Sequence, residues 1–234
     1  MSDYRWLLAL DTSTECCSVA LLSGDALTLR ETLTERGHAD LVLPFVDELL
    51  ATAGFAPTDL DGLAFGRGPG GFTGLRIAAG VVQGLAYAAA LRVVPVSSLA
   101  AVAARVPGAA GETVLVCNDA RMGELYWAHY RLGTDGAVTA LGVERVGPPE
   151  SVAALSEARH AAGNGLARHD GLRTALAARG LRVHDGLYPR ADAIARLGAA
   201  GFAAGLSVAP EDALPVYVRD DVATARVGPV TPLQ

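Results

Sequence analysis

Two apolar runs that each end in aspartate begin similar patterns about 108 residues apart, and this repeat constrains the fold more than any other feature. Residues 4–11 (YRWLLALD) are followed by two strand-like runs that a Gly-Asp turn joins. Residues 113–119 (TVLVCND) are again followed by two strand-like runs. We therefore expect an α/β fold of two related subdomains, 1–107 and 108–234. Each has a mixed sheet that opens with an antiparallel three-stranded meander and is packed with helices.

The helical spacing of apolar residues fills in both halves. It predicts helices over 38–54 and 72–91 in the first half. In the second half it predicts helices over 148–158, 166–180 and 188–205. We expect the last of these, with the Pro-punctuated tail after it, to dock back on the first subdomain.

The stretch GRGPGGFTGLR, residues 66–76, resembles a dinucleotide-binding fingerprint by its letters alone. That fingerprint requires an acidic residue about 20 positions later to hold the ribose, and no Asp or Glu occurs between Gly62 and Gly111. A P-loop is excluded because the chain has no lysine. We expect the glycines to serve a tight strand-to-helix turn, with an anion at the helix start, near Arg67 and Arg76, as the lesser alternative.

The helix over 72–91 carries small residues at helical spacing, which indicates a close helix contact. The helix over 38–54 is apolar on several sides, so one side is left for a partner after the sheet is covered. An ordinary contact within the chain is the alternative. The predicted partner interface comprises Leu41, Phe45, Phe72, Gly74, Arg76, Gly80, Gly84 and Ala88.

The best candidates for chemistry follow the strand-ending aspartates. Asp11, Ser13, Thr14 and the equivalent Asp119 are of the types that hold a metal-bound phosphate, so we predict them as a nucleotide site. The alternative is that they satisfy turn amides. No His pair at helical spacing and no Gly-x-Ser-x-Gly motif is present, so we name no catalytic residue and no metal ligand.

Composition narrows the class of protein. The net charge of −6 at pH 7 disfavours an autonomous nucleic-acid binder. Three sparse cysteines indicate reduced thiols. No uninterrupted apolar run reaches the length of a membrane span, and the N-terminal apolar run is too short for a signal peptide. We therefore expect a cytoplasmic protein without membrane contact.

Six stretches in order over nearly the whole chain resemble the TsaB, or YeaZ-type, family. Gly-Pro-Gly-x-Phe-Thr-Gly-Leu-Arg is the most specific motif among them. The resemblance implies the actin/Hsp70/sugar-kinase-like (ASKHA) fold, with two RNase H-like subdomains. The stretches are LALDTSTECCSVAL, HADLVLPFVDELL, GPGGFTGLRIAAGVVQGLA, VVPVSSLAAVA, DARMGELYWAHY and PVYVR.

The resemblance also implies a function. TsaB-type proteins act in synthesis of N6-threonylcarbamoyladenosine at position 37 of tRNA, as the non-catalytic partner of a related catalytic subunit, TsaD. They form a heterodimer with it, recruit the ATPase TsaE and homodimerise alone. We expect the same of this chain, with tRNA contacted at most indirectly.

Two departures from the superfamily favour a scaffold over a catalyst. The catalytic relative has a His-x-x-x-His metal pair, whereas Val42 stands four residues after His38. The first phosphate loop commonly reads Asp-x-Gly-Thr, whereas Ser13 replaces the glycine. We expect no intrinsic cofactor, with ATP and Mg²⁺ entering only in the complex. An ATP-dependent phosphotransferase is the alternative, and a glycoprotease-like peptidase is less favoured.

Overall fold

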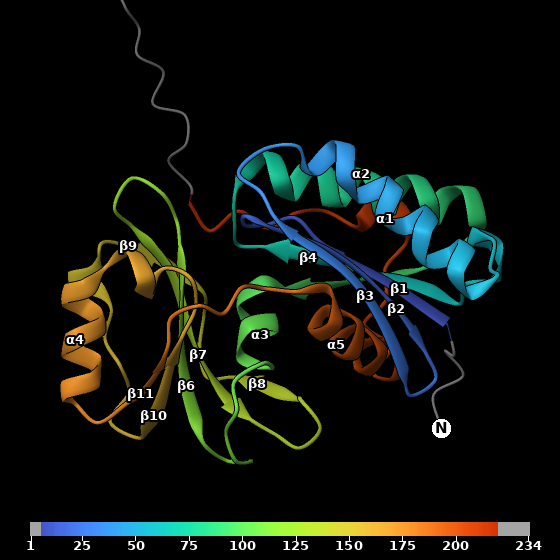
Figure 1. Ribbon diagram of the computed structural model, residues 1–234. Coiled ribbons are helices and arrows are strands. Elements are labelled where there is room, and N and C mark those ends of the chain that lie inside the picture. Colours follow the sequence, from blue (N-terminus) through green and yellow to red (C-terminus); the bar gives the residue numbers. More distant parts are fainter. Residues whose placement is uncertain (1–5, 220–234) are drawn as a thin grey trace, which may run out of the picture.

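A computed structural model describes residues 6–219 and contains two mixed sheets (Figure 1). In the first sheet β1 pairs antiparallel with β2, which pairs with β3, and the other edge continues in parallel through β4 and β5. The order is thus β3-β2-β1-β4-β5. The strands are β1 (Trp6–Asp11), β2 (Cys16–Ser23), β3 (Ala26–Leu33), β4 (Gly62–Gly68) and β5 (Val93–Ser97).

The second sheet repeats this order, with β11-β10-β6-β7-β8 in space and β9 also paired to β7. β6 is antiparallel to β7 and parallel to β10, as β1 is to β2 and β4. The predicted α/β fold with two related mixed sheets is confirmed. The strands are β6 (Thr113–Asp119), β7 (Leu125–Leu132), β8 (Val138–Ala140), β9 (Arg145–Gly147), β10 (Ala158–Ala162) and β11 (Arg182–His184).

Alternation along the strands gives each sheet two buried faces. Leu8 and Leu10 face α1 (His38–Ala53) and α2 (Phe72–Ala89), whereas Leu7 and Ala9 face the opposite side. That opposite side is covered by α5 (Ala191–Ala203), as Figure 1 shows. In the second sheet, α3 (Ser98–Ala103) packs on one face and α4 (Asp170–Ala178) on the other. Both subdomains therefore have their own apolar core.

Helix α5 packs on the first sheet although it follows the second in sequence. Two glycines make this close approach possible: a Cβ on Gly198 would lie 2.5 Å from the Cβ of Ala64, and one on Gly62 would lie 2.4 Å from the Phe202 ring. The predicted boundary at residue 107 falls between α3 and β6. The last helix thus lies against the first sheet, whereas α3, which precedes the predicted boundary, packs on the second.

The prediction fails in three places in the second half. No helix forms over 148–158; only a 3-10 turn, Pro149–Ser151, begins there. The segment instead lays Val152 and Ala154 on the core of the second sheet, so tertiary packing overrides helix propensity. The third strand is split into β8 and β9, and β11 was not anticipated.

The tail after Ala203 is irregular over the described residues, apart from an isolated antiparallel bridge between Val208 and Val93 and the 3-10 turn Pro210–Asp212. Cys16, Cys17 and Cys117 are buried and unpaired, in agreement with reduced thiols. No helix within 6–219 is long and apolar enough to cross a membrane. The PVYVR motif occupies 215–219, and its last four residues line the cleft described next.

Candidate functional site

A cleft of about 630 Å³ opens where the two subdomains meet. Its walls come from the β1–β2 turn, the N-terminal ends of α1 and α2, the β6–β7 turn and the chain at 216–219. Of the four residues predicted to bind nucleotide, Ser13, Thr14 and Asp119 line it, whereas Asp11 does not. The structure therefore brings the turns after the two equivalent strand ends to one cleft.

Asp11 is fully buried and its carboxylate is satisfied inside the protein. Oδ1 accepts hydrogen bonds from the backbone N–H of Ser13 at 2.9 Å and from its hydroxyl at 2.7 Å. Oδ2 accepts one from the Ser98 hydroxyl at 3.2 Å. Burial raises the pKa of Asp11 to about 6, although these hydrogen bonds act in the opposite direction. Asp11 thus fixes the turn that follows it, as the alternative interpretation proposed.

The glycine-rich loop lies against that turn. A Cβ on Gly66 would lie 1.7 Å from Asp11 Oδ2, and one on Gly74 would lie 1.8 Å from the Thr12 carbonyl oxygen. The Thr12 hydroxyl also donates to the Gly74 carbonyl at 2.7 Å.

Gly70 shows the same close approach, since its Cβ would lie 2.4 Å from the Ser13 carbonyl oxygen. That carbonyl accepts a 2.7 Å hydrogen bond from Gly71 N–H. The glycines therefore bring the start of α2 onto the backbone of the β1–β2 turn, where no side chain would fit.

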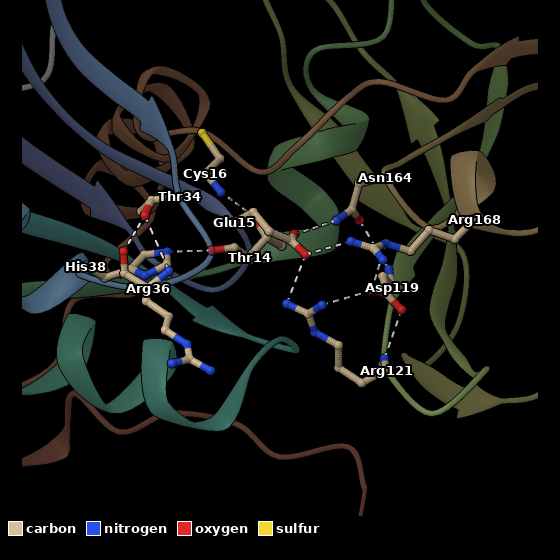
Figure 2. Close-up of polar contacts among 10 residues, drawn as sticks. All are labelled: Thr14, Glu15, Cys16, Thr34, Arg36, His38, Asp119, Arg121, Asn164 and Arg168. Carbon is tan, nitrogen blue, oxygen red and sulfur yellow. Dashed lines mark hydrogen bonds and ion pairs between the residues drawn. The ribbon is translucent and has the colours of Figure 1, made fainter.

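His38 holds the next residue of the turn. Its Nε2 donates to the Thr14 carbonyl oxygen at 2.8 Å, as Figure 2 shows. The Thr14 hydroxyl in turn accepts from Cys16 N–H at 3.3 Å. Val42, which stands where a second His would complete a metal pair, is buried in the core of the first subdomain. His38 thus holds the backbone of the β1–β2 turn at Thr14.

A network of charged side chains joins the two subdomains beside the cleft (Figure 2). Glu15 of the first subdomain forms ion pairs with Arg121 at 2.9 Å and Arg168 at 3.2 Å. Asn164 Nδ2 donates to the same carboxylate at 3.2 Å. Asp119 binds the same two arginines, at 3.7 and 3.1 Å. The network therefore shares two carboxylates between two guanidinium groups across the subdomain boundary.

A second link joins the subdomains through Glu144, which lies in the loop between β8 and β9. Its carboxylate pairs with Arg67 at 3.2 Å and accepts hydrogen bonds from the hydroxyls of Ser97 and Tyr130. Gly142, with a φ of 144°, allows the bend between β8 and β9 that brings Glu144 to this position. The interruption between β8 and β9 thus places Glu144 against Arg67.

The chain after α5 closes one side of the cleft. The Val216 N–H donates to the Arg67 carbonyl at 2.8 Å, which adds a backbone contact beside β4. Tyr217 OH accepts from Arg76 Nε at 3.2 Å, and Arg219 donates to Glu124 in the second subdomain. Residues 216–219 therefore bridge α2 and the start of β7.

Sequence reasoning missed the charged partners of the cleft. Glu15 and Arg121 stand in the turns that follow Asp11 and Asp119, so the repeat made the two turns equivalent, although it aligned Glu15 with Gly123 and Arg121 with Ser13. Arg168 and Glu144 carried no signal of their own. Their contacts depend on how the two subdomains are oriented, which no local pattern encodes.

The arrangement does not fit a metal-bound phosphate. Both strand-ending carboxylates are engaged by the chain's own donors, and the glycine loop covers the turn backbone at Ser13. No group of three or more His, Cys, Asp or Glu within the described residues is placed to hold a metal ion. The cleft thus presents cationic side chains that internal carboxylates already neutralise.

The predicted partner interface divides in two. Phe72, Arg76, Gly80, Gly84 and Ala88 are exposed, and Leu41 and Phe45 are half-buried. Gly74 instead faces Thr12, so its lack of a side chain is required within the chain.

The exposed part of this surface has open space over both glycines. A Cβ on Gly80 or Gly84 would meet nothing within 4 Å. Leu43 on α1 and Tyr87 on α2, which were not among the predicted residues, are also exposed, at 47% and 83%. The Arg76 guanidinium stacks 3.7 Å from the centre of the Phe72 ring, which is itself 46% exposed.

Comparison with known proteins gives consistent matches. Residues 31–178 match the family model described as TsaD, tRNA N6-adenosine threonylcarbamoyltransferase. A tRNA threonylcarbamoyladenosine biosynthesis protein TsaB from Escherichia coli is 40% identical over 93% of this chain and 96% of its own length. The protein of the same name from Haemophilus influenzae is 50% identical over 52% of each chain.

Solved structures agree. A Pseudomonas aeruginosa protein described as having similarity to peptidase YeaZ superposes with a TM-score of 0.79 and 42% identity, over 92% of this chain and 100% of the other. A structure described as YeaZ from Pseudomonas aeruginosa gives a TM-score of 0.78 at 42% identity, over 91% and 99%.

Proposed function

Because the chain belongs to the TsaB family of tRNA threonylcarbamoyladenosine biosynthesis proteins, we propose that it is the non-catalytic subunit that pairs with a TsaD-type catalytic subunit. Its TsaB-type role in the tRNA threonylcarbamoyladenosine pathway follows from the family. The match of residues 31–178 to the TsaD model fits a related partner, since the two chains then share a fold.

The observation that carries the proposal is the exposed surface of α1 and α2, comprising Leu41, Leu43, Phe45, Phe72, Gly80, Gly84, Tyr87 and Ala88. We call it the α1–α2 surface. Its three most exposed large apolar side chains are Tyr87, Leu43 and Phe72. Burying a fully exposed side chain of this kind gains about 1.5–3 kcal/mol, and Leu43 and Phe72, which are about half exposed, would gain roughly half of that. The open space over Gly80 and Gly84 lets a partner helix approach the α2 backbone closely. A partner with a complementary apolar face fits these features.

The cleft supports a scaffold rather than a catalyst. Asp11 and Asp119 are committed to Ser13 and to the arginines, so neither is free to orient a nucleotide phosphate. ATP and Mg²⁺ then act at the level of the complex, where a TsaE-type ATPase would join. The same α1–α2 surface would form a homodimer when the catalytic subunit is lacking. In this role the chain works in the cytoplasm, and tRNA is held mainly by the other subunits.

The phosphotransferase alternative rests on Asp11 and Asp119 at equivalent strand ends, and the peptidase alternative has no supporting contact among the described residues. A reconstituted reaction separates the first of these from the scaffold role. Threonylcarbamoylation of tRNA by the catalytic subunit is measured with the parent chain, with Asp11→Asn and with Gly84→Arg.

The scaffold role predicts that Asp11→Asn retains activity within about twofold, because Asn keeps the oxygen that Ser13 binds. It predicts that Gly84→Arg loses most activity, since the arginine projects from the α1–α2 surface. Loss of activity in Asp11→Asn with a folded chain, and retention in Gly84→Arg, would instead favour chemistry at the cleft.

A further inference from the structure

A second cavity, of about 280 Å³, lies away from the cleft and is lined by arginines. It sits between the end of α3, the β7–β8 turn and the first turns of α5, three segments that Figure 1 shows close together. Arg105, Arg190 and Arg196 line it, with Asp192 as the sole acidic lining residue among the described part of the chain. We call it the arginine cavity.

The charges in the arginine cavity are not balanced. Arg190 is neutralised by Asp192, at 2.6 Å, and by Glu31 on β3, at 3.5 Å. Arg105 makes one described hydrogen bond, from Nη1 to the Tyr188 carbonyl at 2.5 Å, and no ion pair. Arg196 is exposed and makes neither a hydrogen bond nor an ion pair within residues 6–219.

Among the three arginines, Arg105 is the one whose charge is partly buried without an ion pair among the described residues. It is half-buried, and burial, with a smaller effect from the neighbouring charge of Arg190, lowers its pKa, although the carboxylates of Asp192 and Glu31 act in the opposite direction. An anion that contacts both Arg105 and Arg196 would therefore stabilise the charged form of Arg105. Guanidinium groups match phosphate oxygens with paired N–H donors, which makes phosphate the anion that such a group favours.

We propose that the arginine cavity binds a phosphate group between Arg105 and Arg196. The cavity is near the lower limit for small-molecule pockets, so it admits a phosphate with a sugar-sized group rather than a whole dinucleotide. The phosphate comes either from the tRNA backbone, which rests on the proposed function, or from a small phosphorylated molecule.

The position of the arginine cavity allows it to bind a phosphate while a partner occupies the α1–α2 surface. Helix α5 lies on the face of the first sheet opposite to α1 and α2 (Figure 1). A partner on the α1–α2 surface therefore leaves the arginine cavity open. The net charge of −6 works against long-range attraction of RNA, so the contact adds locally to the complex and depends on salt.

The test uses the full chain with two probes, an unmodified tRNA transcript and inorganic phosphate. Arg196→Gln removes one positive charge from the cavity at an exposed position. A neutral glutamine is chosen because an acidic replacement would repel Asp192. Arg159→Gln is the matched control, because Arg159 is also exposed and lies outside the cavity. Thermal unfolding first verifies that both variants are folded.

If the cavity binds a phosphate of the tRNA backbone, Arg196→Gln weakens tRNA binding about three- to tenfold. It also reduces the slope of log K against log salt concentration by about 0.7–0.9, whereas Arg159→Gln has neither effect. For a small phosphorylated ligand, tRNA binding is unchanged, but phosphate shifts the side-chain NMR signals of Arg105 and Arg196. The proposal is overturned if phosphate moves neither signal and the two variants bind tRNA alike. Co-purification of Arg196→Gln with the catalytic subunit reports separately on the proposed function.

Discussion

Glycines at two positions of α2 have opposite roles, and alanine substitutions should separate them. In Gly74→Ala the new Cβ would lie 1.8 Å from the Thr12 carbonyl oxygen, whereas carbon and oxygen atoms normally stay about 3.3 Å apart. Thr12 cannot move away freely, because its hydroxyl is bonded to the carbonyl of Gly74 itself. Overpacking of this kind costs about 1–3 kcal/mol, and the better helix propensity of alanine returns about 1 kcal/mol at most.

Gly84→Ala adds the same methyl group where nothing lies within 4 Å. The propensity gain of about 1 kcal/mol then remains without a packing cost. For a chain of this length about 1 kcal/mol shifts Tm by about 2–4 °C. We expect Gly84→Ala to unfold about 2–4 °C above the parent and Gly74→Ala several degrees below it.

Calorimetric melting of the isolated chain measures both shifts, with urea unfolding as a second measurement of the free energy. Equal Tm values for the two variants would refute the distinction between an internal and an exposed glycine. A stabilised Gly74→Ala would show that the β1–β2 turn is not held against α2 as described.

Two further predictions concern the cleft. The folded-state pKa of Asp11, about 6, lies above its ordinary value of 3.8, so its contribution to stability is complete below about pH 4 and is lost as pH rises through 6. The free energy of unfolding should therefore fall by about 3 kcal/mol between pH 4 and pH 8 because of Asp11, and Asp11→Asn should remove this fall. Urea unfolding at several pH values measures it. Identical pH profiles for parent and variant would contradict the burial of a titrating carboxyl. Glu15→Gln should lower stability by only about 1 kcal/mol, since Arg121 and Arg168 are half exposed, and the loss should shrink in high salt; a loss that salt leaves unchanged would show that charge is not its cause.

Much of the fold could be predicted because it rests on local patterns. The continuous apolar run Leu7–Leu10 predicted a buried strand, which the structure covers on both faces, and the paired Asp11 and Asp119 marked two equivalent strand ends. The same reasoning failed over 148–158, where two prolines and a helix-like spacing belong to an extended segment. There, packing of Val152 and Ala154 on the second sheet decides the conformation, and no local pattern reports it.

The candidate site could be predicted only in part. Ser13, Thr14 and Asp119 do meet at one cleft, because equivalent strand ends of a repeated fold face each other. Which carboxylate meets which arginine depends on the orientation of the subdomains, so the Glu15 network could not be inferred. The sequence predicted that the glycine loop serves a tight turn, since the residues that a phosphate cradle needs are lacking, and in the structure this loop packs on the backbone of the β1–β2 turn.

Pairing through the α1–α2 surface is the central claim, and co-purification with the catalytic TsaD-type subunit tests it most directly. Gly84→Arg places a long cation where the structure has open space, so the chain itself should fold normally. Ala175→Arg, at an exposed position of α4, is the matched control. We predict that the parent and Ala175→Arg bring down the catalytic subunit in equal amounts and that Gly84→Arg brings down at least tenfold less, a loss of about 1.4 kcal/mol or more. Equal recovery with folded Gly84→Arg would contradict pairing through this surface.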